Sequence, residues 1–166
     1  GSPHAVTILE ELIALGGREF LNIGHAGGLY SQGVFLCTKA FRDEGTSYHY
    51  VARGDSALPD QSLTARFGKA LVEQGLTPQR SATWTIDAPY RETPHEIAHY
   101  MKKGAGTVEM EASALFTVGK YRKVKVAAAV VVSDVLGKKW TPKFHEFDVK
   151  NAQNKLIDAA IECLKS

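Results

Sequence analysis

Apolar positions along the chain follow two spacings, one typical of helices and one typical of strands. An apolar residue every three or four positions predicts a helix, and a short apolar or alternating run predicts a strand. The predicted helices are 6–15, 62–74, 94–103, one that begins near 112, and 144–164; the predicted strands are 20–24, 33–40, 79–86 and 124–132. Strands that alternate with helices indicate an α/β fold, a three-layer domain in which helices flank a mixed central sheet.

The predicted strand 124–132 is the most apolar part of the chain. Its residues are small or β-branched, which is typical of a strand covered on both faces. It is expected to end at Ser133 and Asp134, so Asp134 would stand where the strand leaves the sheet. Ligands bind outside the carboxyl ends of strands in open α/β sheets, which makes this a candidate site.

Two more carboxylates lie where a short extended run turns into the helix near Ala112. Glu109 and Glu111 flank Met110 at this point. Acidic residues in a first helical turn also stabilise the helix dipole, and a lone Asp after a strand is often an N-cap. Three carboxylates at two neighbouring strand ends nevertheless favour a functional site.

Other segments leave two interpretations open. The glycine-rich run 24–28 is either an anion-binding turn or only a tight turn before the next strand. His49 lies in the stretch 46–51, where polar and aromatic residues alternate, and is either a ligand contact or a half-exposed strand residue. Residues 137–142 are expected to form a loop.

Helix ends and inward faces can also be read from the sequence. Thr93, Pro94 and Glu96 form a capping box that predicts a helix start. The closing helix is expected to turn these apolar residues inward: Phe147, Val149, Leu156, Ile157, Ala160, Ile161 and Leu164.

Composition narrows the possible functions. The chain has 166 residues, which fits a single domain over 1–166, and its net charge of +2 is too small to favour nucleic acid or a membrane surface as a partner. Cys37 and Cys163 are far apart with no metal-ligand spacing, so both are expected to be core thiols in a reducing, cytoplasmic compartment. No metal site is expected.

Several motifs resemble the nucleoside phosphorylase superfamily, which includes purine nucleoside phosphorylases, uridine phosphorylases and methylthioadenosine/adenosylhomocysteine nucleosidases. Val-Glu-Met-Glu-Ala at 108–112 is followed by Val-Ser-Asp-Val at 132–135. The runs 22–29, 42–49 and 86–91 fall in the expected order, after a helix at 9–16. The similarity spans nearly the whole chain.

The resemblance implies a substrate site for a nucleoside. Glu111 would accept hydrogen bonds from the ribose hydroxyls, Met110 would pack against the sugar and Glu109 would border the base and the sugar. Asp134 would donate a proton to a purine ring nitrogen. Uridine-specific relatives lack an acid at this position, so the presence of Asp134 favours a purine substrate. The resemblance also assigns His49 to the substrate site.

The same resemblance assigns the segment after strand 79–86 to the base. Pro89 and Tyr90 would line the base pocket, and Arg91 would border it. An aromatic ring commonly stands where this chain has Pro89, so the chain departs from the family pattern at the position expected to stack on the base.

The nucleophile side departs from the phosphorylase pattern. Asn22, Gly24 and His25 correspond to the phosphate site, where phosphorylases carry arginine in place of Asn22 and serine or threonine in place of His25. Asn22 lacks the charge and the bidentate fork that recognise phosphate. Nucleosidases also carry asparagine here and use water as the nucleophile. Orthophosphate is therefore a possible co-substrate, and no other cofactor is expected.

Relatives are longer, and the resemblance implies that an N-terminal part is lacking here. That part would carry the first strands, a glycine-rich phosphate loop and an arginine from a dimer partner, or, in nucleosidases, an acidic residue that activates water. Three hypotheses follow: a nucleoside phosphorylase or nucleosidase without its N-terminal part, a short hydrolytic nucleosidase, or a non-catalytic module that binds a nucleoside or nucleobase. Association into a homo-oligomer, a dimer or hexamer, is expected, and so is a role in nucleotide salvage.

Overall fold

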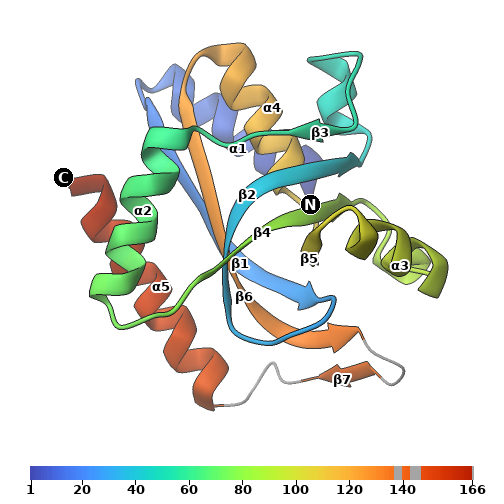
Figure 1. The fold of residues 1–166 in the computed structure, drawn as a ribbon. Coiled ribbons are helices and arrows are strands. Elements are labelled where there is room, and N and C mark those ends of the chain that lie inside the picture. The colour runs from blue at the N-terminus through green and yellow to red at the C-terminus, as the bar shows by residue number, and fades with distance from the viewer. Residues whose placement is uncertain (137–139, 143–146, 166) are drawn as a thin grey trace.

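The computed structural model describes residues 1–136, 140–142 and 147–165. The α-helices are α1 (Ser2–Ala14), α2 (Gln61–Glu73), α3 (Pro94–Lys102), α4 (Ala112–Arg122) and α5 (Phe147–Lys165). The strands are β1 (Glu19–Gly28), β2 (Val34–Asp43), β3 (Ser56–Ala57), β4 (Gln79–Ile86), β5 (Ala105–Glu109), β6 (Lys125–Leu136) and β7 (Trp140–Pro142). Two 3-10 helices, η1 (Thr46–His49) and η2 (Pro89–Arg91), complete the described part (Figure 1).

The strands form one mixed sheet in the order β3-β2-β4-β5-β1-β6-β7. β1 runs parallel to β6, β4 runs parallel to both β2 and β5, and β5 is antiparallel to β1. An additional antiparallel pairing joins β2 to β6. The pairings of β2, β4, β5, β1 and β6 therefore form a closed ring, so the mixed sheet expected from the sequence is confirmed and is also curled on itself.

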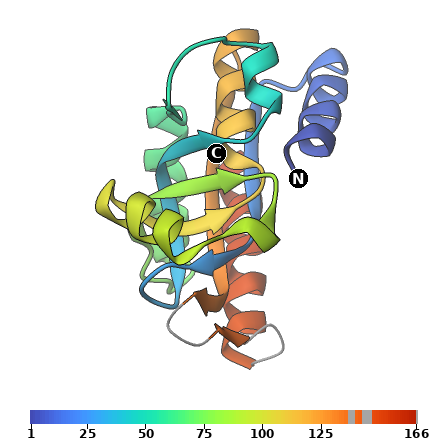
Figure 2. The ribbon, with the colours of Figure 1, turned by 90° about the vertical axis from the view of Figure 1, so that its right-hand side faces the viewer.

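Helices cover two faces of this sheet. One core cluster joins α1 and α4 to even-numbered residues of β6, such as Val126 and Val130. A second cluster joins α2 and α5 to the odd-numbered residues, such as Ala127 and Val131. Figure 1 shows α2 and α5 on one side, α1 and α4 together on another, and α3 apart from both pairs; Figure 2 shows α1 and α4 from the side. β6 is buried on both faces because helices pack on each of them.

Local sequence signals explain several helix starts. The capping box at Thr93 is present: its hydroxyl accepts from the Glu96 amide, and the Glu96 carboxylate accepts from the Thr93 amide. The Asp60 side chain caps α2 by accepting from the Leu63 amide. α4 differs, because every residue from Ala112 to Gly119 is buried. A helix buried all round is positioned by packing rather than by an amphipathic stripe.

The glycine-rich run 24–28 is part of β1, which corrects the prediction of a turn after residue 24. A Cβ on Gly28 would lie 2.4 Å from the Ser31 carbonyl oxygen and 2.8 Å from Val132 Cγ1. A Cβ on Gly27 would lie 3.0 Å from Val108 Cγ1. These glycines are needed because neighbouring groups approach the strand closely, not because the chain turns.

The strand predicted for 124–132 continues to Leu136, which corrects the expected end at Ser133 and Asp134. β7 pairs with this extension, with Asp134 opposite Pro142. Part of the loop expected at 137–142 is thus a strand, and residues 137–139 lie outside the described part. The register with β1 also shifts here, because Ala26 pairs with Val132 and Gly27 with Asp134. Such a bulge bends the strand and redirects its side chains.

Two further predictions differ from the structure. The stretch 46–51 contains η1 instead of strand-like backbone, since Gly45 and Tyr50 have right-handed helical backbone angles on either side of it. The closing helix begins at Phe147, and residues 144–146 and the Phe147 side chain lie outside the described part. Val149, Leu156 and Ala160 are buried as expected, whereas Ile157, Ile161 and Leu164 are 38%, 47% and 47% exposed.

The two cysteines lie in the core, as predicted. Cys37 and Cys163 are both buried free thiols. In the described ranges, no helix is long and apolar enough to cross a membrane.

Candidate active site

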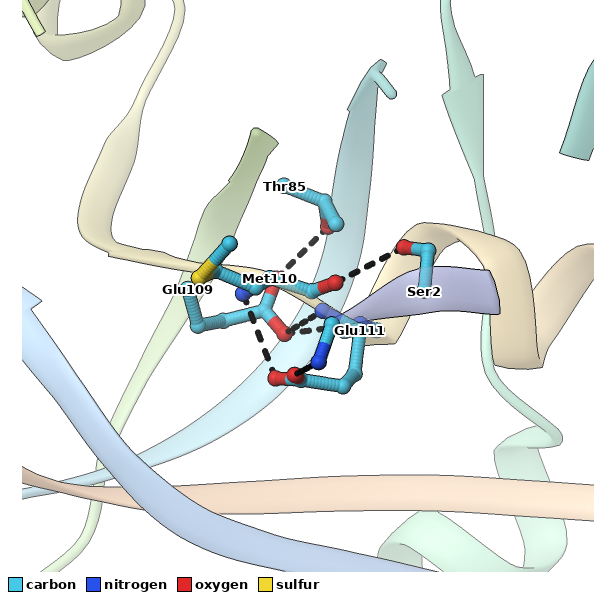
Figure 3. Close-up of polar contacts among 7 residues, drawn as sticks. Ser2, Thr85, Glu109, Met110 and Glu111 are labelled. Atoms are coloured by element: carbon cyan, nitrogen blue, oxygen red, sulfur yellow. Dashed lines mark hydrogen bonds and ion pairs between the residues drawn. The ribbon is translucent and has the colours of Figure 1, made fainter. Parts of the chain in front are cut away.

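The segment Glu109–Glu111 joins the end of β5 to the start of α4, as the sequence predicts. Glu109 is the last residue of the strand, and Glu111 immediately precedes the helix. Met110 and Glu111 are half-buried, whereas Glu109 is only 5% exposed. Figure 3 shows the three residues on one turn, with the Glu109 carboxylate directed toward Thr85.

Glu109 makes three hydrogen bonds to the protein. One carboxylate oxygen accepts from the Thr85 hydroxyl at 2.6 Å. The other oxygen accepts from the backbone amides of Glu111 at 2.8 Å and Ala112 at 2.7 Å (Figure 3). These amides open α4 and would otherwise lack partners within the helix. Glu109 therefore fixes the turn and caps the helix.

Burial raises the pKa of Glu109 to about 7, and its bonds to Thr85, Glu111 and Ala112 oppose this rise. The Glu111 charge raises the same pKa further. Glu109 thus changes charge in the neutral pH range.

The start of α1 lies on the same turn. The Ser2 hydroxyl, fully buried, donates to the Met110 carbonyl oxygen at 2.7 Å. The ammonium group of Gly1 lies 2.6 Å from a Glu111 carboxylate oxygen, and the Glu111 side chain is 29% exposed. Glu111 is accordingly a partly exposed carboxylate, and an ionised carboxylate accepts hydrogen bonds.

Asp134 lies two strands away from this turn. Gly27 of β1 pairs with Val108 on one side and with Asp134 on the other. Two inter-strand spacings of about 4.8 Å place the backbones of Val108 and Asp134 about 10 Å apart. The Asp134 carboxylate accepts from the Ser133 hydroxyl at 2.9 Å and is half-buried. The fold therefore brings Asp134 near the segment that carries Glu109–Glu111.

The segment predicted to line the base pocket is η2. Pro89, Tyr90 and Arg91 are all exposed, Tyr90 fully so. The next residue, Glu92, is half-buried, and burial followed by the nearby charges of Asp134 and Glu96 raises its pKa to about 7. Glu92 was not anticipated from the sequence, where it looks like an ordinary residue before a helix cap. The Asp134 charge raises the pKa of Glu92, which indicates that the end of η2 lies close to the Asp134 carboxylate.

The residues predicted for the nucleophile side all belong to β1, but they lie on its two different faces. Ala26 belongs to the core beneath α1 and α4, whereas Ile23 packs against the core beneath α2 and α5. Side chains alternate along a strand, so Asn22 and Gly24 share the face of Ala26 and His25 leaves the opposite face. Asn22 and Gly24 are half-buried and His25 is exposed.

His49 is exposed at the end of η1, which packs against α1 and α4. Its position is thus on the α1–α4 side of the sheet. Within the residues that the structure describes, no three His, Cys, Asp or Glu side chains are arranged to hold a metal ion.

A buried polar network extends from the turn and was missed at the sequence level. The Ser113 amide donates to the Thr85 hydroxyl, and the Ser113 hydroxyl donates to Glu44. Glu44 also accepts from the Ser47 amide, and the Ser47 hydroxyl accepts from Arg42. The available signal was Thr83 and Thr85 alternating with Trp84 and Ile86 in the last part of β4, since a fully buried hydroxyl needs partners.

Three hollows on the surface lie away from Glu109, Glu111 and Asp134, and Asn22 lines one of them. One is lined by 58–62 and the end of α4, one by α2 and 76–80, and one by α1 and the start of β1. None of these three is lined by Glu109, Glu111 or Asp134. The candidate site is therefore defined by the carboxylates of Glu109, Glu111 and Asp134 and their hydrogen bonds.

The chain is similar in sequence to nucleoside phosphorylases. The chain is 30% identical over 147 residues to uridine phosphorylase of Treponema pallidum, covering 80% of this chain and 57% of that protein. It is 27% identical over 140 residues to purine nucleoside phosphorylase of Plasmodium falciparum, covering 80% and 57%. The matched segment thus spans less than two thirds of these relatives.

A solved structure supports the fold over its full extent. The crystal structure of AMP nucleosidase from Bacteroides thetaiotaomicron superposes with a TM-score of 0.80 and 26% identity, covering all of this chain and 70% of that one. The family model of the phosphorylase superfamily matches residues 1–165. Because that match takes in the strands, the Glu-Met-Glu turn and Asp134 together, the chain belongs to the phosphorylase superfamily.

Proposed function

We propose that this chain holds a nucleoside by its ribose at Met110 and Glu111 and takes part in cleaving the N-glycosidic bond. The observation that carries the proposal is the Glu111 carboxylate, which is partly exposed and stands on a turn fixed by hydrogen bonds. An ionised carboxylate only accepts hydrogen bonds, so it suits two neighbouring hydroxyl groups. Met110 supplies an apolar surface beside it.

Bond cleavage demands two things of the site. The ribose becomes oxocarbenium-like as the bond breaks, and the departing base gains negative charge. Glu111 holds the sugar in place, which lowers the entropic cost of reaching the transition state. Asp134 protonates the base as general acid, and this favours a purine, whose ring nitrogen can take the proton.

Hydrolysis is the second candidate reaction, and Asn22 favours it. A neutral amide in place of a guanidinium gives orthophosphate no charged partner. AMP nucleosidase is also among the structures similar to this chain. In this case water attacks the sugar and orthophosphate is not required.

The test is cleavage of inosine and adenosine by the whole protein, with and without orthophosphate. Phosphate-dependent release of base supports phosphorolysis, and phosphate-independent release supports hydrolysis. Asp134→Asn should keep nucleoside binding but lose most of the activity. Unchanged activity in Asp134→Asn would refute the role of Asp134, and binding without any cleavage would favour a binding module.

Three expectations accompany this proposal. Residues 1–166 act as one domain, copies associate into a dimer or hexamer, and orthophosphate is the only co-substrate considered. The open side of β1 supports association: among the described pairings, β1 meets β5 only at Gly27 and Gly28, so its first part pairs with β6 alone. An unpaired strand edge favours contact with another chain.

A further inference from the structure

The Glu109 carboxylate makes its described hydrogen bonds to Thr85 and to the backbone amides of Glu111 and Ala112. We infer that Glu109 is a positioning residue whose ionised carboxylate fixes the backbone of Met110 and Glu111, so that ribose binding at Glu111 depends on the charge of Glu109. This inference rests on the proposed function and deepens it. It replaces direct contact of Glu109 with the substrate by an action through Glu111.

The first step is the bridge between two amides. A single Glu109 oxygen accepts from both Glu111 and Ala112, at 2.8 and 2.7 Å. Bonds of this length to an ionised acceptor are about twice as strong as neutral ones. The Glu111 amide is thus held from below while its side chain reaches the surface. Loss of the bridge would free the backbone that aims this side chain.

The second step is the cost of a proton on Glu109. The oxygen that bridges the amides has no room for a proton between two donors. The other oxygen receives the Thr85 hydroxyl, whose own oxygen already accepts from the Ser113 amide. The Thr85 oxygen keeps a second lone pair, so a proton on this Glu109 oxygen can be donated to it. The carboxyl group is then neutral, and its bonds from the Glu111 and Ala112 amides weaken.

The third step is the electrostatic surroundings. The charge of Glu111 on the same turn raises the pKa of Glu109, and burial raises it more. On β2, burial and then the nearby Glu109 charge raise the pKa of the Cys37 thiol. From α4, Ser113 links the network to Glu44. Arg42, the side-chain cation of this network, donates to the Ser47 hydroxyl and to backbone carbonyls rather than to Glu109. Protonation near neutral pH follows from these neighbours.

The first experiment follows backbone amides by NMR without any ligand. The amide signals of Glu111 and Ala112 should titrate with a midpoint near 7. Glu109→Gln should abolish this titration, and Glu73→Gln, at an exposed position on α2, should leave it unchanged. A flat response of both amides in the wild-type protein would overturn the inference. Because the wild-type titration needs no substitution, a poorly folded variant does not prevent the test.

Thr85→Val provides a second variant. It removes a hydrogen bond that lowers the pKa of Glu109, so the midpoint of the amide titration should move to higher pH. An unchanged midpoint would contradict the assigned geometry.

The second experiment measures binding of inosine and of hypoxanthine by calorimetry between pH 5.5 and 8. Wild-type affinity for inosine should fall below the midpoint, by up to about tenfold for each pH unit, since one proton is taken up. Hypoxanthine lacks ribose and should not show this loss. Glu109→Gln should bind inosine with no such dependence on pH, and Glu73→Gln should behave as the wild type does.

The two experiments separate the inference from the proposed function. A wild-type pH profile in Glu109→Gln overturns the inference while ribose binding stands. The opposite outcome is also possible: the amides titrate, but the protein binds no inosine at any pH. This result refutes the proposed function and the dependence of ribose binding on Glu109, and it leaves Glu109 only the structural role of holding the two amides.

Discussion

Replacing Thr85 by valine tests the buried network most directly. Valine keeps the shape of threonine and removes only the hydroxyl. Thr85 is fully buried on β4, and its hydroxyl both donates to Glu109 and accepts from the Ser113 amide. The substitution therefore leaves two buried polar groups without this partner and opens no cavity.

The expected loss follows from these two groups. An unsatisfied buried amide costs about 1–3 kcal/mol, and a lost hydrogen bond to a charged group costs about 1.5–3 kcal/mol. The two effects share one hydroxyl and are not independent, so we expect Thr85→Val to lower the free energy of unfolding by about 3 kcal/mol.

Thr83 offers a matched control on the same strand. It is also fully buried, but its hydroxyl makes one described bond, a long one of 3.3 Å to the Thr107 carbonyl oxygen. Thr83→Val should therefore cost about 1 kcal/mol or less. Urea unfolding followed by circular dichroism at pH 8, where Glu109 is ionised, measures both variants. Equal losses in the two variants would refute the network argument.

Three further predictions concern the same helix and turn. Burial raises the pKa of Glu109 from 4.5 to about 7, so the folded state binds the Glu109 proton more tightly than the unfolded chain does. The resulting stabilisation is complete below pH 4.5 and is lost as the pH rises through 7. In urea titrations the free energy of unfolding, relative to Glu109→Gln, should fall by at most about 3 kcal/mol across this window, and a constant difference would contradict the prediction. Gly119→Ala should lower the free energy of unfolding by about 1–3 kcal/mol, because the new Cβ would lie 2.5 Å from Val126 Cγ2. Gly68→Ala on α2 should be near neutral, because its Cβ would lie 3.0 Å from the end of the Leu36 side chain and alanine favours the helix. Equal thermal shifts in the two variants would refute this prediction. Glu111→Gln should weaken inosine binding by about 10–100-fold and leave hypoxanthine binding unchanged in calorimetry, and equal losses for both ligands would exclude a role confined to ribose.

Local chemistry was enough to predict much of the chain. β4 has the predicted bounds 79–86, the Thr93 capping box is formed, and the turn from strand to helix falls at Glu109–Ala112. Both cysteines are buried as expected. These features depend on side-chain periodicity and on hydrogen bonds within a few residues, which the sequence specifies directly.

Side-chain direction in the site could not be predicted in the same way. Two acidic residues flank Met110 in the sequence, yet Glu109 turns inward to Thr85 and Glu111 turns outward. Thr85 lies 24 residues away from Glu109, so only the pairing of β4 with β5 brings them together. Glu92 acquires its raised pKa in a comparable way, from burial and from the distant Asp134.

The sequence by itself determined the alternation of the longer strands and helices, the Thr93 capping box and the Glu-Met-Glu turn, because each depends on neighbours along the chain. Only the tertiary structure decided that β1 runs through Gly27 and Gly28, that β6 extends past Asp134, and that the sheet closes through β2 and β6. The physical reason is the same for all three: close approach of Val108 and Val132, a new partner strand, and a ring of pairings are long-range contacts, which periodicity along the chain does not encode.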